Sequence, residues 1–355
     1  MKTSFILGSG WVTPSGRGIS DVIASIREER RPFVSHEQAP SGASIPTYRI
    51  ASDLTADAAA FPRLRRSSKI SLFALSAAID AVRNAGLTTE EAARMGVVFA
   101  ASNGGVIYTR RFFENVIRDG AGAGSPLLFP ETVYNSPASH IAAYFKSDAP
   151  AFTFVGDSCT GLDAISAGLE MLGTGEVEHC LVLGAEEVDG ISADAYARTG
   201  LLAGCEQKPK SQAVSSEGAG AIVLGSGPID TGSAWRIAEG PFLSVYEGRA
   251  EIGDALRDLL LRLKSSGSPD LIVASLSGSP LDGDERGGLR AVFPDTPIVS
   301  PKSVLGEAMA AAAIQQVVTA CNWLLPSRAA EVIVTSIGFG GHVAALRLTR
   351  GCVGD

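Results

Sequence analysis

The chain has 355 residues and a formal net charge of −8, with 45% hydrophobic and 19% charged residues. This composition is typical of a globular protein with a sizeable core, and its acidic balance argues against nonspecific binding to nucleic acid. No apolar run reaches the roughly 18 residues that cross a bilayer, and no signal peptide precedes the first predicted strand. We therefore expect a cytoplasmic protein with neither a membrane nor a nucleic-acid partner.

The five cysteines and four histidines are dispersed along the chain, and no two cysteines have CxxC spacing. An odd number of scattered cysteines predicts neither a disulfide framework nor a zinc site. We expect no metal ion and no cofactor.

Residues 1–230 alternate between strand and helix patterns. Strands are predicted over 4–7, 96–101, 152–155, 180–183 and 218–224. Helices are predicted over 19–27, 67–85, 90–94, 109–117 and 139–145, and a further helix begins near Cys159. A glycine-rich turn is expected over 8–14, an irregular segment over 31–62, and a loop from 184 to 210.

Residues 231–355 repeat this alternation. Strands are predicted over 235–239, 271–275, 297–299, 331–336 and 342–348, and helices over 252–264, 285–292 and 306–324. Each half ends with a long helix of small residues and two strands. The pattern predicts an α/β protein in two similar halves, with a boundary near residue 230.

The stretch from Phe152 to Ile165 places a cysteine between a short apolar strand and an amphipathic helix. Cys159 then lies at a helix N-terminus, where free N–H groups and the positive end of the helix dipole favour thiolate over thiol. Such a thiolate attacks an acyl thioester, and backbone N–H groups bind the oxyanion. The other interpretation is a buried, inert cysteine, since free cysteines are among the most buried residues.

Several segments stand out in order along the chain. They are Gly8–Pro14, Arg63–Lys69, Leu127–Pro130, Asn135–Ile141, Asp157–Gly161, Ser216–Gly220, Lys302 with Gly306, and Gly338–His342. With these segments in this order and spacing, nearly the whole chain resembles the β-ketoacyl-acyl carrier protein synthases.

The resemblance implies a thiolase fold of two similar βαβαβαββ halves in five layers (αβαβα). It implies an acyl chain carried on Cys159, with the N–H groups of Cys159 and Phe339 as the oxyanion hole. Gly338, Gly340 and Gly341 would let the backbone approach the thioester closely. As partners it implies an acyl carrier protein with phosphopantetheine-linked acyl chains, and a homodimer or a heterodimer with a ketosynthase homologue.

Two histidines that assist the cysteine in the family's condensing enzymes have no counterpart here. The first would follow the strand over 271–275, where Ser275, Ser277 and Ser279 are the available substrate-binding side chains, and the second position carries Glu307. A carboxylate accepts hydrogen bonds but cannot donate them, and losing one oxyanion donor costs roughly 3–4 kcal/mol. Standard decarboxylative condensation is therefore not expected of this chain.

Two roles are open for Glu307. Kept protonated by burial, it would donate a hydrogen bond; ionised, it would act as the general base for Cys159. Lys302 is expected to support the site by pairing with Glu307 or Glu217. Asp157 is expected to be an N-cap or turn residue rather than a catalytic group.

A compact basic cluster lies in this acidic chain, formed by Arg63, Arg65, Arg66 and Lys69. One interpretation is a solvated helix start. The other is docking of an acidic carrier protein, because opposite surface charges steer association.

Three functions are compatible with these features. The favoured one is a β-ketoacyl synthase-like acyltransferase that forms an acyl thioester on Cys159 in fatty-acid or polyketide-type biosynthesis. The alternative is a non-elongating partner of a true ketosynthase, similar to the chain-length factors of type II polyketide systems. The third is a ligand-binding protein without acyl chemistry, since a fold does not determine function.

Overall fold

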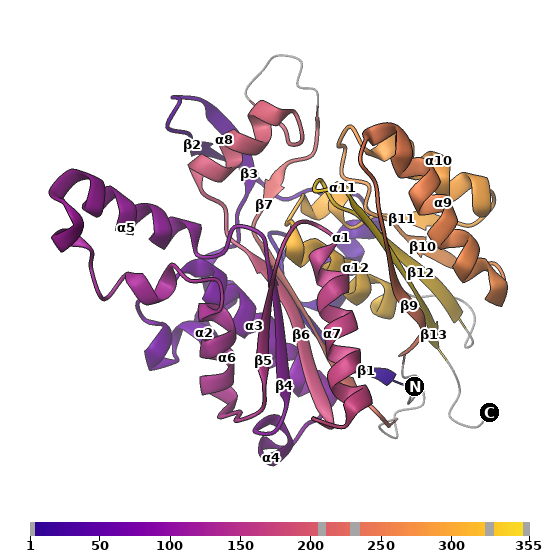
Figure 1. Cartoon of the computed structure of the whole chain (residues 1–355), viewed down its shortest axis with the longest axis horizontal. Coiled ribbons are helices and arrows are strands. Elements are labelled where there is room, and N and C mark those ends of the chain that lie inside the picture. The colour runs from indigo at the N-terminus through magenta and orange to yellow at the C-terminus, as the bar shows by residue number, and fades with distance from the viewer. Residues whose placement is uncertain (1–3, 205–210, 228–234, 324–329, 351–355) are drawn as a thin grey trace.

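The computed structural model describes residues 4–204, 211–227, 235–323 and 330–350, and Figure 1 shows its elements. The strands of the first half are β1 Ser4–Val12, β2 Val34–Gln38, β3 Ser44–Tyr48, β4 Gly96–Ala101, β5 Ala151–Val155, β6 His179–Glu186, β7 Ser215–Ser216 and β8 Gly218–Gly225. Its helices are α1 Ile19–Arg27, α2 Ala56–Ala59, α3 Lys69–Ala85, α4 Thr89–Ala92, α5 Val106–Asp119, α6 Ser136–Phe145, α7 Thr160–Thr174 and α8 Gly190–Thr199.

The second half continues the alternation. Its strands are β9 Trp235–Val245, β10 Leu271–Val273, β11 Ile298–Val299, β12 Ala330–Ile337 and β13 His342–Arg350. Its helices are α9 Ile252–Leu263, α10 Asp282–Val292, α11 Lys302–Leu305 and α12 Ala310–Asn322.

Backbone hydrogen bonds join the main strands in the order β11-β10-β12-β13-β9-β1-β8-β6-β4-β5. Both ends of this sheet are built alike. A parallel three-strand edge, β5-β4-β6 or β11-β10-β12, is followed by two antiparallel pairings. The halves are joined where Ser4 to Ile6 of β1 pair with Trp235 to Ile237 of β9.

Alternate side chains of the strands enter different cores, and this shows how the layers stack. Val98 of β4 packs in a central core with α7 and α12, whereas its neighbour Phe99 faces an outer core with α3. Val334 of β12 enters the same central core, whereas Ile333 faces α9 and α10, at the right of Figure 1. The strands therefore enclose α7 and α12 between them. The predicted five-layer thiolase-type arrangement is confirmed.

The first strand is longer than predicted. β1 runs through Val12, so the predicted turn from Gly8 is wrong. A Cβ on Gly8 would come within 2.3 Å of the Ala81 carbonyl oxygen, and one on Gly10 within 2.4 Å of that of Ala77. These glycines let α3 lie directly against the strand.

Two segments form elements that the sequence did not predict. Residues 31–62 contain the β2–β3 hairpin, which pairs with β7 in a small sheet, and residues 190–199 form α8. No side chain of β2 is buried, and α8 buries only Gly190 and Ala193. Both segments therefore lack the apolar periodicity that reveals an amphipathic element.

The helix predicted over 306–324 starts later, at Ala310. Gly306 and Met309 have φ angles of 85° and 45°, which interrupt the helix between α11 and α12. Residue 324 lies outside the described ranges.

Two expected absences can be examined only over the described ranges. There, no helix has both the length and the apolar character needed to cross a bilayer. Histidine, cysteine and carboxylate side chains in the same ranges form no group of three or more that could hold a metal ion.

Candidate active site

Cys159 lies at the end of the β5–α7 turn, as the sequence predicts, and is the N-cap residue of α7. Its side chain is buried, with 1% exposed. The thiol donates a hydrogen bond to the carbonyl oxygen of Ser336 at 3.2 Å, and the carbonyl oxygen of His342 is 3.4 Å away. Burial and the nearby Asp157 charge raise the pKa of the Cys159 thiol well above its usual value. The protein therefore holds a neutral thiol, not the thiolate expected at a helix start.

The Asp157 carboxylate lies across the glycine loop that faces this cysteine. Its Oδ1 accepts the N–H of Cys159 at 3.0 Å, and its Oδ2 accepts the N–H of Gly340 at 2.5 Å. A Cβ on Gly338 would lie only 2.1 Å from Oδ1. Asp157 thus has the predicted turn contact with Cys159, and in addition binds a loop that no sequence pattern connects with it.

The two N–H groups expected to form the oxyanion hole belong to Cys159 and Phe339. The Cys159 N–H donates to the Asp157 carboxylate. The other backbone N–H that donates to this carboxylate belongs to Gly340 and not to Phe339. The half-buried Phe339 ring packs instead against a small cluster that includes Met309. Gly341, the last glycine of the loop, has a φ of 97° and accepts the N–H of Tyr246 at its carbonyl oxygen.

Lys302 and Glu307 form a buried ion pair with 2.9 Å between Nζ and Oε2. Lys302 Nζ also donates to the Ser275 hydroxyl at 2.8 Å. The other carboxylate oxygen, Oε1, accepts the Met309 N–H at 2.9 Å and the Ser158 hydroxyl at 3.1 Å. Of the two carboxylates that could have paired with Lys302, the structure shows Glu307, while Glu217 binds Arg49.

Ser158 connects this ion pair with the cysteine. Its hydroxyl donates to Glu307, and its carbonyl oxygen accepts the Ser336 hydroxyl at 2.8 Å. The Ser336 carbonyl in turn accepts the Cys159 thiol. The acid–base residues and the thiol therefore share one buried hydrogen-bond network.

The serine segment lines a cavity of about 10 Å³ between Glu307 and Phe339. Ser277 and Ser279 are held by Asp282, which accepts the Ser277 N–H at 3.2 Å and the Ser279 hydroxyl at 3.1 Å. A cavity of this volume has space for about one water molecule, and not for an acyl chain.

Two buried glutamates near the site were not predicted. Glu285 accepts the Ser275 N–H at 2.8 Å and the Thr335 hydroxyl at 2.9 Å, and burial raises its pKa to about 7. Burial likewise raises the pKa of Glu186 to about 8, although hydrogen bonds from the loop after β4 act in the opposite direction and lower it. Neither residue belongs to a sequence motif, and only the Asp-Gly-Asp-Glu run at the start of α10 offered a signal.

Comparison with known proteins identifies the family. The model of the β-ketoacyl synthase N-terminal domain matches residues 5–227, more than half of the chain. This chain is a member of the β-ketoacyl synthase family. Among curated proteins, none matches this family member.

Solved structures that resemble this family member include three named for ketosynthases. The ishigamide ketosynthase/chain length factor has a TM-score of 0.81 at 19% identity, covering 98% of this chain and 99% of that one. The structure of AntDE:AntF, a type II PKS acyl-carrier protein in complex with its ketosynthase bound to the hexaketide, has a TM-score of 0.79 at 16% identity. The match covers 98% of this chain and 99% of that one. A β-ketoacyl synthase from Burkholderia phymatum STM815 has a TM-score of 0.80 at 17% identity, and the match covers 99% of this chain and 100% of that one. At such identities the likeness shows the fold.

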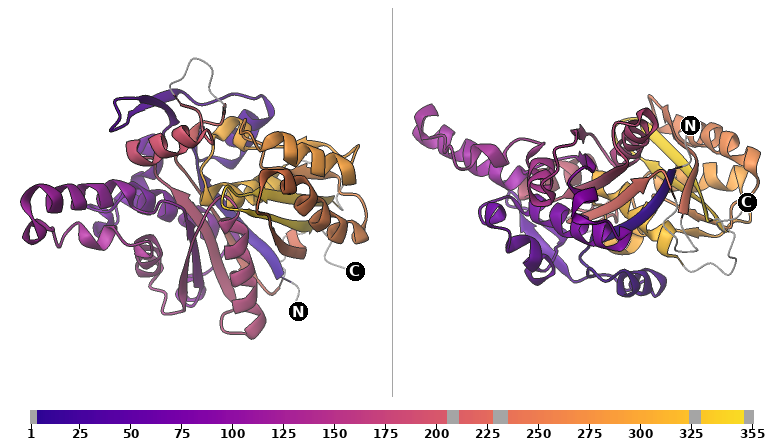
Figure 2. Two further views of the ribbon diagram at one scale, coloured as in Figure 1. Left: turned by 45° about the horizontal axis from the view of Figure 1, so that its top comes forward. Right: turned by 90° about the horizontal axis from the view of Figure 1, so that it is seen from below.

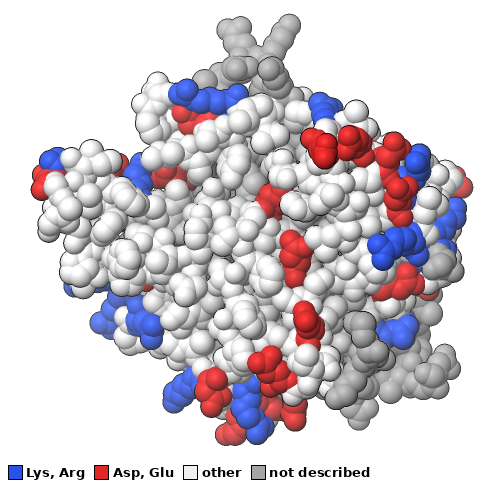
Figure 3. All heavy atoms as spheres, viewed as in Figure 1, with Lys and Arg blue, Asp and Glu red and all other residues white. Residues whose placement is uncertain are grey.

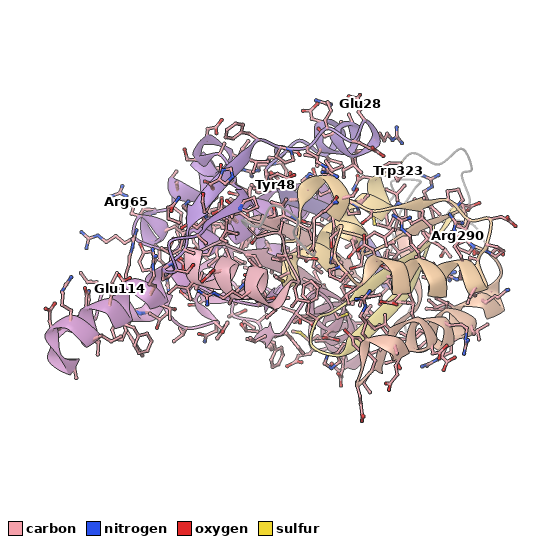
Figure 4. All side chains as sticks on the ribbon, turned by 90° about the horizontal axis from the view of Figure 1, so that it is seen from above. Glu28, Tyr48, Arg65, Glu114, Arg290 and Trp323 are labelled. Carbon is pink, nitrogen blue, oxygen red and sulfur yellow. The ribbon has the colours of Figure 1, made fainter. Side chains whose placement is uncertain are left out.

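The basic cluster of this ketosynthase-family chain lies at the surface around the start of α3. Arg63 donates to His140 Nδ1 at 3.1 Å, and Lys69 lies 3.7 Å from Glu217 Oε1. Arg65 and Arg66 are exposed, and Arg65 projects away from the body of the protein in Figure 4. The cluster is therefore accessible to a partner.

An apolar surface spans α5 and the edge strand β5. No residue of α5 is buried, and the helix extends away from the layers as an arm, seen at the left of Figure 2. On β5, Phe152 is 48% and Val155 53% exposed. Figure 3 shows this face largely without charged side chains. Further exposed apolar residues on or near the arm are Phe113, Ile117, Leu127 and Phe129.

Proposed function

We propose that this chain is the non-condensing partner of a histidine-containing ketosynthase in fatty-acid or polyketide-type biosynthesis. The observation that carries the proposal is the bonding of Glu307, which stands where the resemblance places a catalytic histidine. Its oxygens accept from the Lys302 ammonium and the Met309 N–H, and both of these groups can only donate. Glu307 is thereby held as an acceptor, and it cannot stabilise an enolate oxygen by donating a proton.

The same bonding argues against Glu307 as a base for Cys159. Both carboxylate oxygens are already engaged, and the thiol hydrogen bonds that the structure describes go to the carbonyl oxygens of Ser336 and His342. A base must lie within hydrogen-bond reach of the proton that it removes.

The apolar surface of α5 and β5 supports association with a second ketosynthase-type chain. An edge strand offers unpaired backbone groups, and large exposed apolar patches mark interaction sites. Two of the similar structures are named as a ketosynthase/chain length factor and as a ketosynthase complex with an acyl-carrier protein. We infer a heterodimer that forms through this surface, with the basic cluster at residues 63–69 as the docking site for the acidic carrier protein.

The test is reconstitution. The chain is purified alone and mixed with a ketosynthase that contains the cysteine and both histidines, and condensation of acyl and malonyl thioesters on a carrier protein is measured. We expect a stable complex, no condensation by this chain alone, and a changed product length in the mixture. A homodimer of this chain that condenses malonyl units by itself would contradict the proposal.

A second candidate function is acyl transfer through Cys159. The observation that favours it is the position of the thiol at the start of the 15-residue helix α7, beside a glycine loop. Intact-protein mass spectrometry after incubation with acyl thioesters tests it. A Cys159 adduct on the unmodified protein would support this function over the first.

A further inference from the structure

Besides its turn contact at the helix start, the Asp157 carboxylate binds the glycine loop, a contact that the proposed function does not require. It joins the N–H of Cys159 to the N–H of Gly340, two groups that are 181 residues apart in the chain (340 − 159). Backbone N–H groups beside a nucleophile are the donors that bind a thioester oxygen as it becomes negative. The Asp157 carboxylate accepts one of these two N–H groups on each of its oxygens, so it occupies both donors with a negative charge.

We propose that Asp157 silences Cys159 by occupying these donors, over a thiol site that is otherwise able to accept an acyl group from a thioester. The inference rests on the proposed function, because it explains how a member of this family keeps its cysteine without using it. Asp157 is a positioning residue in this account, since it acts on Cys159 through the backbone.

The glycine loop keeps its position through contacts that do not involve Asp157. The Gly338 N–H donates to the His342 carbonyl at 2.9 Å, and its carbonyl oxygen accepts the Tyr246 hydroxyl at 2.5 Å. The Tyr246 N–H binds the Gly341 carbonyl at 2.8 Å. Removal of the carboxylate should therefore leave the loop in place and free both N–H groups.

Asp157 also lies on the solvent side of the thiol. Its side chain is half-buried, Gly156 and Gly340 beside it are exposed, and Cys159 is buried beneath. A smaller side chain at position 157 should therefore give an acyl donor more access to this part of the loop.

The reaction that becomes available is a simple thioester exchange. The Cys159 sulfur forms a bond to the carbonyl carbon, and the bond from that carbon to the original sulfur breaks. The proton of the Cys159 thiol passes to the departing thiolate, so charge and atoms balance. Negative charge on the carbonyl oxygen would be repelled by the native carboxylate but bound by the two free N–H groups.

The experiment compares four proteins with hexanoyl-N-acetylcysteamine as the acyl donor. They are the native chain, Asp157→Ser, Asp157→Ser with Cys159→Ala, and Asp163→Asn, which removes the carboxylate in the first turn of α7. Intact mass and peptide mapping measure one hexanoyl group on Cys159. We expect Asp157→Ser to be acylated about 100-fold faster than the native chain, since single oxyanion donors have effects of this size. The double variant should not be acylated at Cys159, and Asp163→Asn should behave like the native chain.

Two outcomes would overturn the inference. One is equal acylation of the native chain and Asp157→Ser, and the other is a folded Asp157→Ser that stays unreactive. If that variant does not fold, Asp157→Asn keeps the shape, and its neutral amide binds N–H groups more weakly, so an increase of about tenfold is expected and its absence overturns the inference. The proposed function is tested separately by malonyl condensation with the native chain, which does not depend on these variants.

Discussion

Lys302 Nζ lies 2.9 Å from Glu307 Oε2, and both side chains are buried. An isolated charge at this depth would be strongly destabilising, so each residue accounts for the presence of the other. The pair also removes Glu307 from any chemistry that requires a free proton donor.

Replacement of Lys302 by Met should therefore lower the free energy of unfolding by about 3–5 kcal/mol, because Glu307 is left buried without its cation. Urea unfolding followed by circular dichroism measures the effect. The double variant Lys302→Met with Glu307→Gln has no unpaired charge at this position, so its free energy of unfolding should fall less than that of Lys302→Met. Equal losses in the single and double variants would contradict this view of the pair.

Gly306 should tolerate no side chain. Its φ of 85° and ψ of −178° lie in a region open almost only to glycine, and a Cβ would meet Tyr48, Ser216 and Val214 within 2.7 to 2.8 Å. Gly306→Ala should destabilise the protein by about 3 kcal/mol or more. Gly175→Ala is the matched control, since Gly175 has a φ of 76° and nothing within 4 Å of a Cβ. It should cost about 1 kcal/mol, and a similar loss at both positions would argue against the clash.

Stability should fall as the pH rises from about 5 to 8. The pKa of Glu285 is raised to about 7 and that of Glu186 to about 8, from an ordinary value of 4.5, so over this range the folded chain binds more protons than the unfolded chain. The two glutamates contribute their full stabilisation below about pH 4.5. This contribution is lost as the pH rises through the pKa that each group has in the folded chain. The free energy of unfolding should therefore decrease, by at most about 1.4 kcal/mol per pH unit for each group.

Single substitutions distinguish the contribution of Glu285 and Glu186 to this pH dependence from that of other groups. Glu285→Gln and Glu186→Gln should each flatten the dependence measured by urea unfolding at pH 5, 6.5 and 8. Glu90→Gln, at an exposed position of α4, should leave it unchanged. A slope that is the same in all four proteins would refute the assignment.

The β5 edge can be tested with a single charge. Phe152→Lys places an ammonium group in the proposed interface and should weaken binding to a ketosynthase partner at least about tenfold, because central aromatic residues dominate interface energetics. Leu261→Lys on α9, where the native residue is 50% exposed, is the control and should bind normally. Light scattering coupled to size-exclusion chromatography measures the complex, and an unchanged mass for Phe152→Lys would exclude this surface.

Reversal of two exposed charges tests the carrier-protein site. Arg65→Glu with Arg66→Glu should weaken carrier-protein binding and reduce its dependence on salt, since opposite charges steer association. Arg257→Glu, on the distant helix α9, should have little effect. Fluorescence anisotropy of a labelled carrier protein measures all three, and equal binding by the double variant and the native chain would place docking elsewhere.

Sequence patterns predicted most of this fold because its central elements bury regular apolar stripes. The helices α1, α3 and α9 and the strand β4 lie within a few residues of their predicted positions. The β2–β3 hairpin and α8 were missed because their buried apolar surface is small. Gly8 was misread because close packing and a turn select the same residue type.

The site was predicted in part for a similar reason. The position of Cys159 follows from a local strand–turn–helix pattern, and Lys302 and Glu307 are five residues apart. The contact between Asp157 and Gly340 spans 183 residues and depends on how two loops meet after folding. No spacing rule within one segment could have revealed it.

The backbone pairing of β1 with β9 has a mechanical consequence. A protein whose halves share one continuous ladder cannot open like a clamshell. A hinge between the halves therefore cannot enlarge the 10 Å³ cavity between Glu307 and Phe339, and a larger guest at this place requires local movement of the residues that line it.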